Sequence, residues 1–270
     1  MKYAEHGVSA VASRFVQCIW SLEGDGLDPA AGADPILPDG CVELLLDTGD
    51  PVDRHTLDAV ERQPQRQVAG QLTTAVRIKP TGRLGVIGIR LHPWAAGVFL
   101  RVPMHELRDR MLPADDLKVA GALLRDASNG EGAAERLRLL QGAIERHALT
   151  LSAPGPAAMA LATRLMRDHD VPTIRALADD VGLTTRRVQA IFADQVGLSP
   201  KALSRISRLQ RALAYARSRP HRTLTAVAHH SGYYDQAHFI RDCRDIAGEP
   251  PGSLLGRTDD VTTAFLASGA

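Results

Sequence analysis

Short apolar runs and partial alternation of apolar and polar residues characterise the first third of the chain, as in β-strands. Turn residues separate these runs and predict five strands, at residues 13–22, 41–47, 68–72, 75–79 and 83–93. Residues 24–40 are rich in Gly, Pro and Asp, which predicts a long turn region. The pattern favours a small β-rich domain, either a partial barrel or a sandwich.

The apolar spacing changes to three and four after residue 93, as in amphipathic helices. Helices are predicted at residues 94–101, 107–111, 117–127 and 133–147, and the last two are separated by Ser-Asn-Gly-Glu-Gly. Those two could form an antiparallel hairpin. Residues 150–157 contain two prolines and a glycine and mark the best domain boundary. We therefore predict an α+β chain with a regulatory domain at residues 1–150.

Helical periodicity and capping residues fill the rest of the chain. Thr173, Thr184 or Thr185, and Asp235 are each placed to cap a helix, and Ser199-Pro200 opens a longer one. The long helix should end near residue 217, before a proline. An all-α domain is predicted at residues 157–256, and residues 257–270 are expected to form a loose tail.

The C-terminal part contains an internal repeat. Residues 173–203 and 223–254 share the positions of a helix, a glycine turn, a second helix and a closing Gly-x-x-Pro. Gly182 matches Gly232, Val188 matches Phe239, and Phe192 matches Cys243. A helix, a tight turn and a second helix with long hydrogen-bonding side chains are typical of a helix-turn-helix DNA reader. Two such units so close together predict a tandem array.

The second copy carries the string SGYYDQAHFIRDCR, followed by Gly-x-x-Pro. This string resembles the C-terminal signature of AraC/XylS-type transcription regulators. The chain departs from that signature at Cys243, Pro250 and Leu254, which are packing or capping positions. The strings ILPDGCVELLLD, GVIGIRLHPWAAGVFL and VPMHELRDR resemble the N-terminal domain of one AraC-type subgroup without a well-established ligand. The resemblance implies a transcription regulator, with double-stranded DNA and RNA polymerase as partners.

Arginine and glutamine can read base edges in the major groove. The second helix of each unit therefore supplies the candidate readers, with Arg205 and Arg208 of the long helix as candidate phosphate contacts. His238 could instead be an ordinary surface histidine, and Arg244 could be solvated or paired with a nearby aspartate. The candidate DNA-binding residues are Arg186, Arg187, Gln189, Gln236, His238, Arg241, Arg244, Arg205 and Arg208.

The net charge of only +1 argues against a uniformly basic protein that coats nucleic acid. Basic charge is instead concentrated at residues 201–222, which include seven Lys or Arg and no acidic residue. The three cysteines lie far apart and predict neither a disulfide framework nor a zinc site. We expect no metal and no cofactor. No signal-like or membrane-spanning segment stands out, so a cytoplasmic protein is expected.

Trp20, Arg90, His92 and Trp94 could line an effector pocket, or could be ordinary packing at a domain seam. The first functional hypothesis is a non-enzymatic regulator controlled by a small-molecule effector or a partner. The alternative is a DNA reader fused to a catalytic or cysteine-based repair domain, with Cys41 as the nucleophile. In a third reading, the helix hairpin at residues 117–147 mediates formation of a homodimer and no ligand exists.

Overall fold

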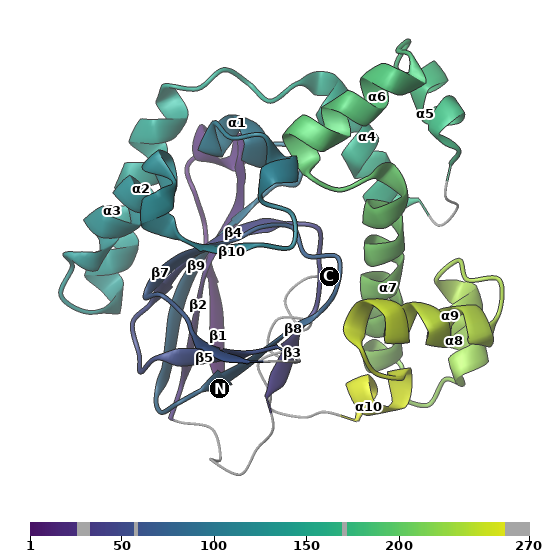
Figure 1. Cartoon of the computed structure of the whole chain (residues 1–270), viewed down its shortest axis with the longest axis horizontal. Coiled ribbons are helices and arrows are strands. Elements are labelled where there is room, and N and C mark those ends of the chain that lie inside the picture. The colour runs from purple at the N-terminus through teal and green to yellow at the C-terminus, as the bar shows by residue number, and fades with distance from the viewer. Residues whose placement is uncertain (26–32, 57–58, 169–171, 257–270) are drawn as a thin grey trace.

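The computed structural model describes residues 1–25, 33–56, 59–168 and 172–256. Its N-terminal part contains two antiparallel sheets (Figure 1). The six-stranded sheet has the order β1 (Lys2–His6), β2 (Val16–Gly24), β9 (Leu84–Leu91), β4 (Val42–Asp47), β7 (Arg66–Ala69), β10 (Met111–Pro113). The four-stranded sheet has the order β3 (Asp34–Ile36), β8 (Val76–Pro80), β5 (Val52–His55), β6 (Val60–Arg62). The predicted β-rich N-terminal region is confirmed.

All five predicted strands form, within a few residues of the expected bounds. The sequence pattern missed β1, β3, β5, β6 and β10, which are short or largely polar. The helix predicted at residues 107–111 is wrong. That segment turns through Asp109, which has a φ of 57°, and then forms β10, which pairs with β7. Pairing between distant strands overrides the local pattern here.

Three helices cover the outer face of the large sheet, namely α1 (Ala96–Leu100), α2 (Lys118–Ser128) and α3 (Ala133–Leu149). The 3₁₀ turn η1 (Ala12–Arg14) lies between β1 and β2, and the turns η2 (Met104–Glu106) and η3 (Ala114–Asp116) flank β10 between α1 and α2. Strand β4 shows how the two faces divide, because alternate side chains of a strand point in opposite directions. Val42, Leu44 and Leu46 pack into the core beneath the helices. Glu43 and Asp47 point to the opposite face, toward a cavity.

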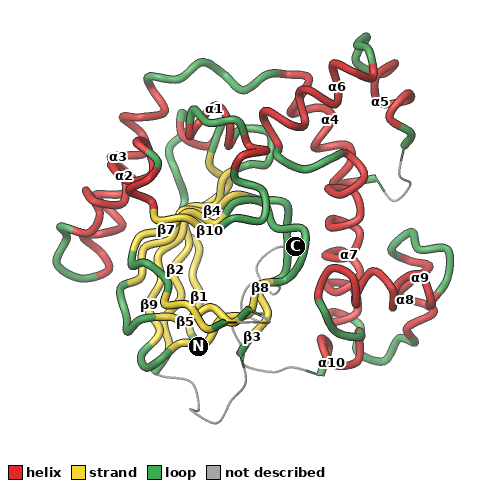
Figure 2. Tube along the Cα trace, viewed as in Figure 1, coloured by secondary structure: helices red, strands yellow, loops and turns green. Residues whose placement is uncertain are grey.

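The C-terminal part is entirely helical, as predicted (Figure 2). Its elements are α4 (Pro156–Arg167), α5 (Ile174–Asp180), α6 (Thr185–Ile191), η4 (Phe192–Val196), α7 (Pro200–Ser218), α8 (Leu224–His230), α9 (Gln236–Asp242), η5 (Cys243–Ala247) and α10 (Pro251–Leu255). The long helix α7 stands between a pair of helices at each end, α5–α6 and α8–α9 (Figure 1). The predicted tail at 257–270 lies outside the described residues.

The helix starts follow from the capping residues. The side-chain oxygens of Thr173, Thr184, Ser199 and Asp235 each accept a hydrogen bond from the backbone N–H three residues later. Thr223 caps α8 in the same way. These contacts involve only neighbouring residues, which is why the sequence predicted most of them correctly.

The internal repeat is confirmed in three dimensions. Gly182 and Gly232 both adopt positive φ values, of 64° and 80°, at the turn between the paired helices. Val188 and Phe239 are both fully buried, as are Phe192 and Cys243. Each unit continues beyond its second helix into a five-residue π-helical segment, η4 or η5. The two units therefore share a backbone path and a buried framework.

The helical part also packs on the sheets. Arg77 in β8 forms an ion pair with Glu249 at 2.6 Å, and the N–H of Ala75 donates to the carbonyl of Ile246 at 2.7 Å. On the other side, Gly197 sits so close to Met104 that an added Cβ would lie 2.8 Å from its carbonyl oxygen. Both helix-turn-helix units therefore contact the N-terminal part.

Candidate DNA interface and ligand cavity

The second helix of the first unit, α6, presents a polar outer face. Arg186, Arg187 and Gln189 are exposed, while Val188 and Ile191 are buried against the rest of the unit. The predicted division of this helix into an inner apolar and an outer polar side is thus what the structure shows. The two guanidinium groups and the amide are free to approach a ligand from solvent.

The second helix of the second unit, α9, is more complex. Arg241 and Arg244 are exposed. Gln236 is half-buried and its side-chain oxygen accepts a hydrogen bond from the Thr225 hydroxyl at 2.9 Å. His238 turns inward, since its Nε2 lies 3.3 Å from a nitrogen of Arg208 and its ring stacks edge-on against Tyr233. The structure leaves Arg241 of α9 and Arg244 of the following segment η5 as the most accessible cations of this region.

Arg205 and Arg208 do not occupy the positions expected of phosphate contacts. Arg208 is 7% exposed and donates to Asp242 Oδ2 at 3.0 Å. Arg205 donates to the other oxygen, Oδ1, at 2.7 Å and also to Asp245 at 3.0 Å. The prediction for Arg208 is therefore corrected: it is an internal ion-pair partner that fastens α9 to α7. Arg205 is partly exposed but shares this role.

Two further arginines of the basic run at 201–222, Arg211 and Arg217, also have partners inside the protein. Arg211 donates through its two terminal nitrogens to the carbonyls of Met166 and Asp168. Arg217 donates to the carbonyl of Leu254 at 3.1 Å. The absence of acidic residues in this run reflects partners that come from other helices. The run is mainly a structural device and only its exposed members, such as Arg219 and Arg222, face solvent.

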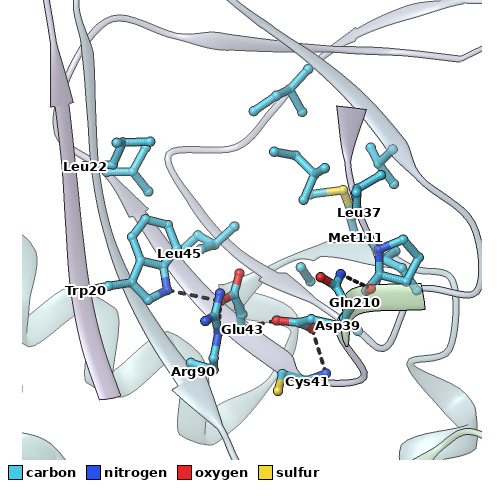
Figure 3. A pocket seen from close by; sticks show the side chains of 18 of the residues that line it. Trp20, Leu22, Leu37, Asp39, Cys41, Glu43, Leu45, Arg90, Met111 and Gln210 are labelled. Atoms are coloured by element: carbon cyan, nitrogen blue, oxygen red, sulfur yellow. Dashed lines mark hydrogen bonds and ion pairs between the residues drawn. The ribbon is translucent and has the colours of Figure 1, made fainter. Parts of the chain in front are cut away.

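A cavity of about 540 Å³ lies between the sheets and α7 (Figure 3). Most of its wall is apolar, with side chains from both sheets. The apolar lining includes Leu22, Ile36, Leu45, Val52, Ile78, Leu84, Val86 and Met111. Its volume falls within the usual range for sites that hold small organic molecules, about 300–1,000 Å³.

A charged cluster stands in the wall near Trp20 (Figure 3). Arg90 Nε donates to Glu43 Oε1 at 2.9 Å and lies 3.4 Å from Asp39 Oδ2. The indole N–H of Trp20 donates to the same Glu43 oxygen at 3.0 Å. Burial raises the pKa of Glu43, and Arg90 opposes that rise. Burial alone would lower the pKa of Arg90, but the charges of Glu43 and Asp39 outweigh it and raise that pKa.

Two further polar side chains in the wall lack partners for one oxygen each. Asp47 is 5% exposed and Gln67 is 2% exposed. Within the described residues, Asp47 Oδ2 and Gln67 Oε1 accept no hydrogen bond. The amide nitrogen of Gln67 donates to Gln63 at 3.3 Å, which leaves the oxygen as its free end. Burial raises the pKa of Asp47 to about 7.

One stripe of α7 forms the opposite wall. Ser207, Gln210, Arg211 and Ala214 all line the cavity, at the three- and four-residue spacing of one helix face. Gln210 also donates to the carbonyl of Pro38 at 2.5 Å, which joins α7 to the loop before β4. The cavity is therefore shared between the sheet region and the helix that carries both helix-turn-helix units.

The pocket residues proposed from the sequence divide into two groups. Trp20 and Arg90 line the cavity. Trp94 is not among the lining residues and its ring stacks on His92 with centroids 4.6 Å apart, in contact with both the sheet core and the helical core. The inclusion of Trp94 is corrected, because it packs at the seam. Sequence reasoning missed Asp47, Gln67 and Arg211, although acids at alternating positions of a buried strand were a visible signal.

Comparison with known families bears on both parts of the chain. Residues 177–257 match the family model described as "Helix-turn-helix domain". Together with the tandem geometry, this match identifies the C-terminal part. It is an AraC-type helix-turn-helix domain. Residues 9–113 match a second model, described as "Domain of unknown function (DUF6597)". No curated protein matches the chain.

The solved structures that match this chain show only distant likeness to it. ToxT from Vibrio cholerae O395 is 8% identical with a TM-score of 0.49, over 93% of this chain and 99% of that chain. ToxT from strain SCE256 with a bound unsaturated fatty acid is 9% identical with a TM-score of 0.46, over 89% and 96%. The AraC-like transcriptional activator CuxR is 14% identical with a TM-score of 0.25, over 74% of each chain. These values assign neither fold nor ligand to the present chain.

The cysteines do not support a reactive thiol beside the helix-turn-helix domain. Cys18, Cys41 and Cys243 are all buried and free. Burial raises the pKa of the Cys41 thiol, and the neighbouring charge of Asp39 raises it further. A thiol must ionise to act as a nucleophile, so these surroundings weigh against the cysteine-based alternative.

Among the described residues, no cluster of three metal-binding side chains occurs and no helix could span a bilayer.

Proposed function

We propose that this protein is a sequence-specific transcription regulator whose helices α6 and α9 read two adjacent major grooves. The observation that carries the proposal is the repeated unit, with an exposed Arg-containing helix in each copy, held at the two ends of α7. Helix α7 has 19 residues and is about 28 Å long. Successive major grooves on one face of DNA are about 34 Å apart, which suits this spacing.

Base reading is assigned to the exposed side chains of the two helices. In α6 these are Arg186, Arg187 and Gln189, and in the second unit they are Arg241 of α9 and Arg244 of η5. Arginine can donate two hydrogen bonds to guanine, and glutamine can pair with adenine. Gln236 is a further candidate once its bond to Thr225 opens, whereas His238 is better placed to orient α9.

We further propose that the occupant of the cavity controls DNA binding. A molecule there would touch the sheets and the α7 stripe at once. On its other side, α7 holds α9 through Arg205 and Arg208. A shift of α7 would therefore change the position of α9 relative to α6. A ligand that binds the shifted and unshifted arrangements differently would change affinity for DNA by that difference.

RNA polymerase and a second copy of the chain remain proposed partners. The helix hairpin of α2 and α3 is the candidate surface for a homodimer, as the sequence suggested. A cytoplasmic location fits a regulator that must reach DNA. The direction of control, activation or repression, depends on the operator's place relative to a promoter.

Selection of bound DNA from a random pool tests the proposal. We expect an enriched site with two conserved blocks centred about 10–11 base pairs apart. Selection with Arg241→Ala should lose information in one block only, and selection with Arg187→Ala in the other. Arg108→Ala, an exposed arginine of the N-terminal part, serves as the control and should return the parent site. No enriched sequence, or a single short block, would contradict the proposal.

A further inference from the structure

The deep wall of the cavity combines an unpaired carboxylate with a neighbouring unpaired amide oxygen. Asp47 in β4 and Gln67 in β7 lie on adjacent paired strands and both face the cavity. Gln67 is directly opposite Leu45, so Asp47 is its diagonal neighbour on the same face. Both free atoms, Asp47 Oδ2 and Gln67 Oε1, are hydrogen-bond acceptors.

Burying such a pair of acceptors costs free energy unless a donor group binds them. A buried carboxylate without a partner loses its hydration and gains nothing in return. The only cause of the raised pKa of Asp47 is burial, so no neighbouring cation offsets that cost in this structure. A buried acceptor pair of this kind is stabilised by a donor group, above all by one that carries positive charge.

The other charged side chains of the wall are already engaged. Arg90 is balanced by Glu43 and Asp39, which leaves that cluster without an excess of positive charge. Arg211 has committed its two terminal nitrogens to backbone carbonyls and only its Nε lacks a partner. A carboxylate ligand prefers two parallel N–H groups of an arginine. Arg211 has already committed both terminal nitrogens, and Arg90 stands beside two acids that would repel an anion.

We infer that the cavity takes a hydrophobic amine, an organic molecule with an apolar body and a protonated amino group that Asp47 and Gln67 hold. The apolar body would fill the space between Leu22, Leu84 and Met111. Arg211 Nε and the hydroxyls of Ser207 and Ser231, which also lack partners, form the far wall and suit an uncharged acceptor on the same molecule. This inference rests on the proposed control by a cavity ligand and specifies its chemistry.

Three probes of matched shape test the ligand class, namely 2-(1-naphthyl)ethylamine, 2-(1-naphthyl)ethanol and 1-naphthaleneacetate. Each is titrated calorimetrically into the full chain at pH 8, where Asp47 is mostly ionised. The amine is expected to bind at least tenfold more tightly than the alcohol or the acid. Equal affinities, a preference for the acid, or no binding of the amine would each overturn the inference. This ranking uses the unaltered protein and does not depend on any variant folding.

Two variants locate the binding to Asp47. Asp47→Asn keeps the size of the side chain and should lower the affinity for the amine about tenfold, to the level of the alcohol. Glu145→Gln neutralises an exposed acid on α3 and should leave the affinity unchanged. An Asp47→Asn protein that binds the amine as tightly as the parent would also overturn the inference.

The failure of this inference is distinguishable from the failure of the proposed function. If the acid binds best and changes the affinity for the selected DNA site, the ligand class is wrong while control by the cavity stands. If DNA selection returns no pair of blocks, DNA reading as proposed is wrong, whatever the ranking of the three probes.

Discussion

The two helix-turn-helix units have the same backbone path but are held in place by different forces. Asp242 ends α9 in the second unit and is 2% exposed, with both oxygens bonded to arginines of α7. The equivalent residue of the first unit is Ile191, which ends α6 and packs without charge. The second unit is therefore fastened to α7 by a buried charge network, and the first by apolar contacts.

The same difference recurs where each unit meets the sheets. In the second unit, Glu249 is nearly buried and forms an ion pair with Arg77 of β8. The equivalent position in the first unit is Leu198, which is fully buried. Arg77 is the half-exposed member of that ion pair, and water can solvate it when the contact opens, whereas exposing buried leucine always costs free energy. We therefore expect the second unit to separate from the sheet region more readily than the first.

The largest expected effect comes from Asp242→Ala. Removal of this carboxylate leaves two guanidinium groups without their shared partner, which should lower the free energy of unfolding by about 3–5 kcal/mol. Asp245→Ala is the control, because Asp245 is exposed and bonds only Arg205, and should cost under about 1 kcal/mol. Urea unfolding monitored by circular dichroism measures both. Similar small losses for the two variants would mean that the charge network does not hold the second unit.

The buried Asp47 in the cavity wall can be tested independently of both helix-turn-helix units. Asp47 has a pKa of about 7 in the folded protein and an ordinary one near 4 when unfolded. The folded state therefore binds the extra proton, and stability should fall as the pH rises from about 4 to about 7 and then level off. Asp47→Asn should remove this fall and stabilise the ligand-free protein at pH 8 by up to about 4 kcal/mol. Chemical unfolding at pH 5 and pH 8 measures the difference, and identical pH profiles for variant and parent would contradict it.

Loss of one reading arginine should affect one half of the DNA site. Arg241→Ala is expected to weaken specific binding by about 1–3 kcal/mol and to relax base choice in the block read by α9. Arg187→Ala should do the same in the block read by α6. Fluorescence anisotropy with single-base variants of the selected site measures both. If either variant binds every sequence more weakly by the same factor, its arginine contacts phosphate rather than bases.

The smallest effect on stability, under about 1 kcal/mol, is expected for Arg77→Ala. The effect of Arg77→Ala should appear instead in local opening of the second unit, since the substitution removes the ion pair between β8 and that unit. Hydrogen exchange of backbone amides at 243–251 should accelerate, while exchange at 192–200 stays unchanged. Equal acceleration in both segments would break the distinction between a second unit held by charges and a first unit held by apolar packing.

Local features of this fold could be predicted from the sequence, whereas contacts between residues far apart in the sequence could not. The caps Thr173, Ser199 and Asp235 act within three residues, and the buried framework of the repeat follows helical spacing. By contrast, Arg208 was expected on the DNA, because its partner Asp242 lies 34 residues further along the chain. Strand β10 and the unpaired Asp47 also depend on pairing across the sheet, which no local pattern specifies.

The most direct test of the central claim is the spacing of the two half-sites on DNA. Once the site is selected, five base pairs are inserted between its two blocks, which places the second block on the opposite face of the duplex. Because α7 links the two units at a fixed distance, we predict that this insertion weakens binding at least tenfold, to the level of a single block. Unchanged affinity after the insertion would show that the units read DNA independently and would contradict the account.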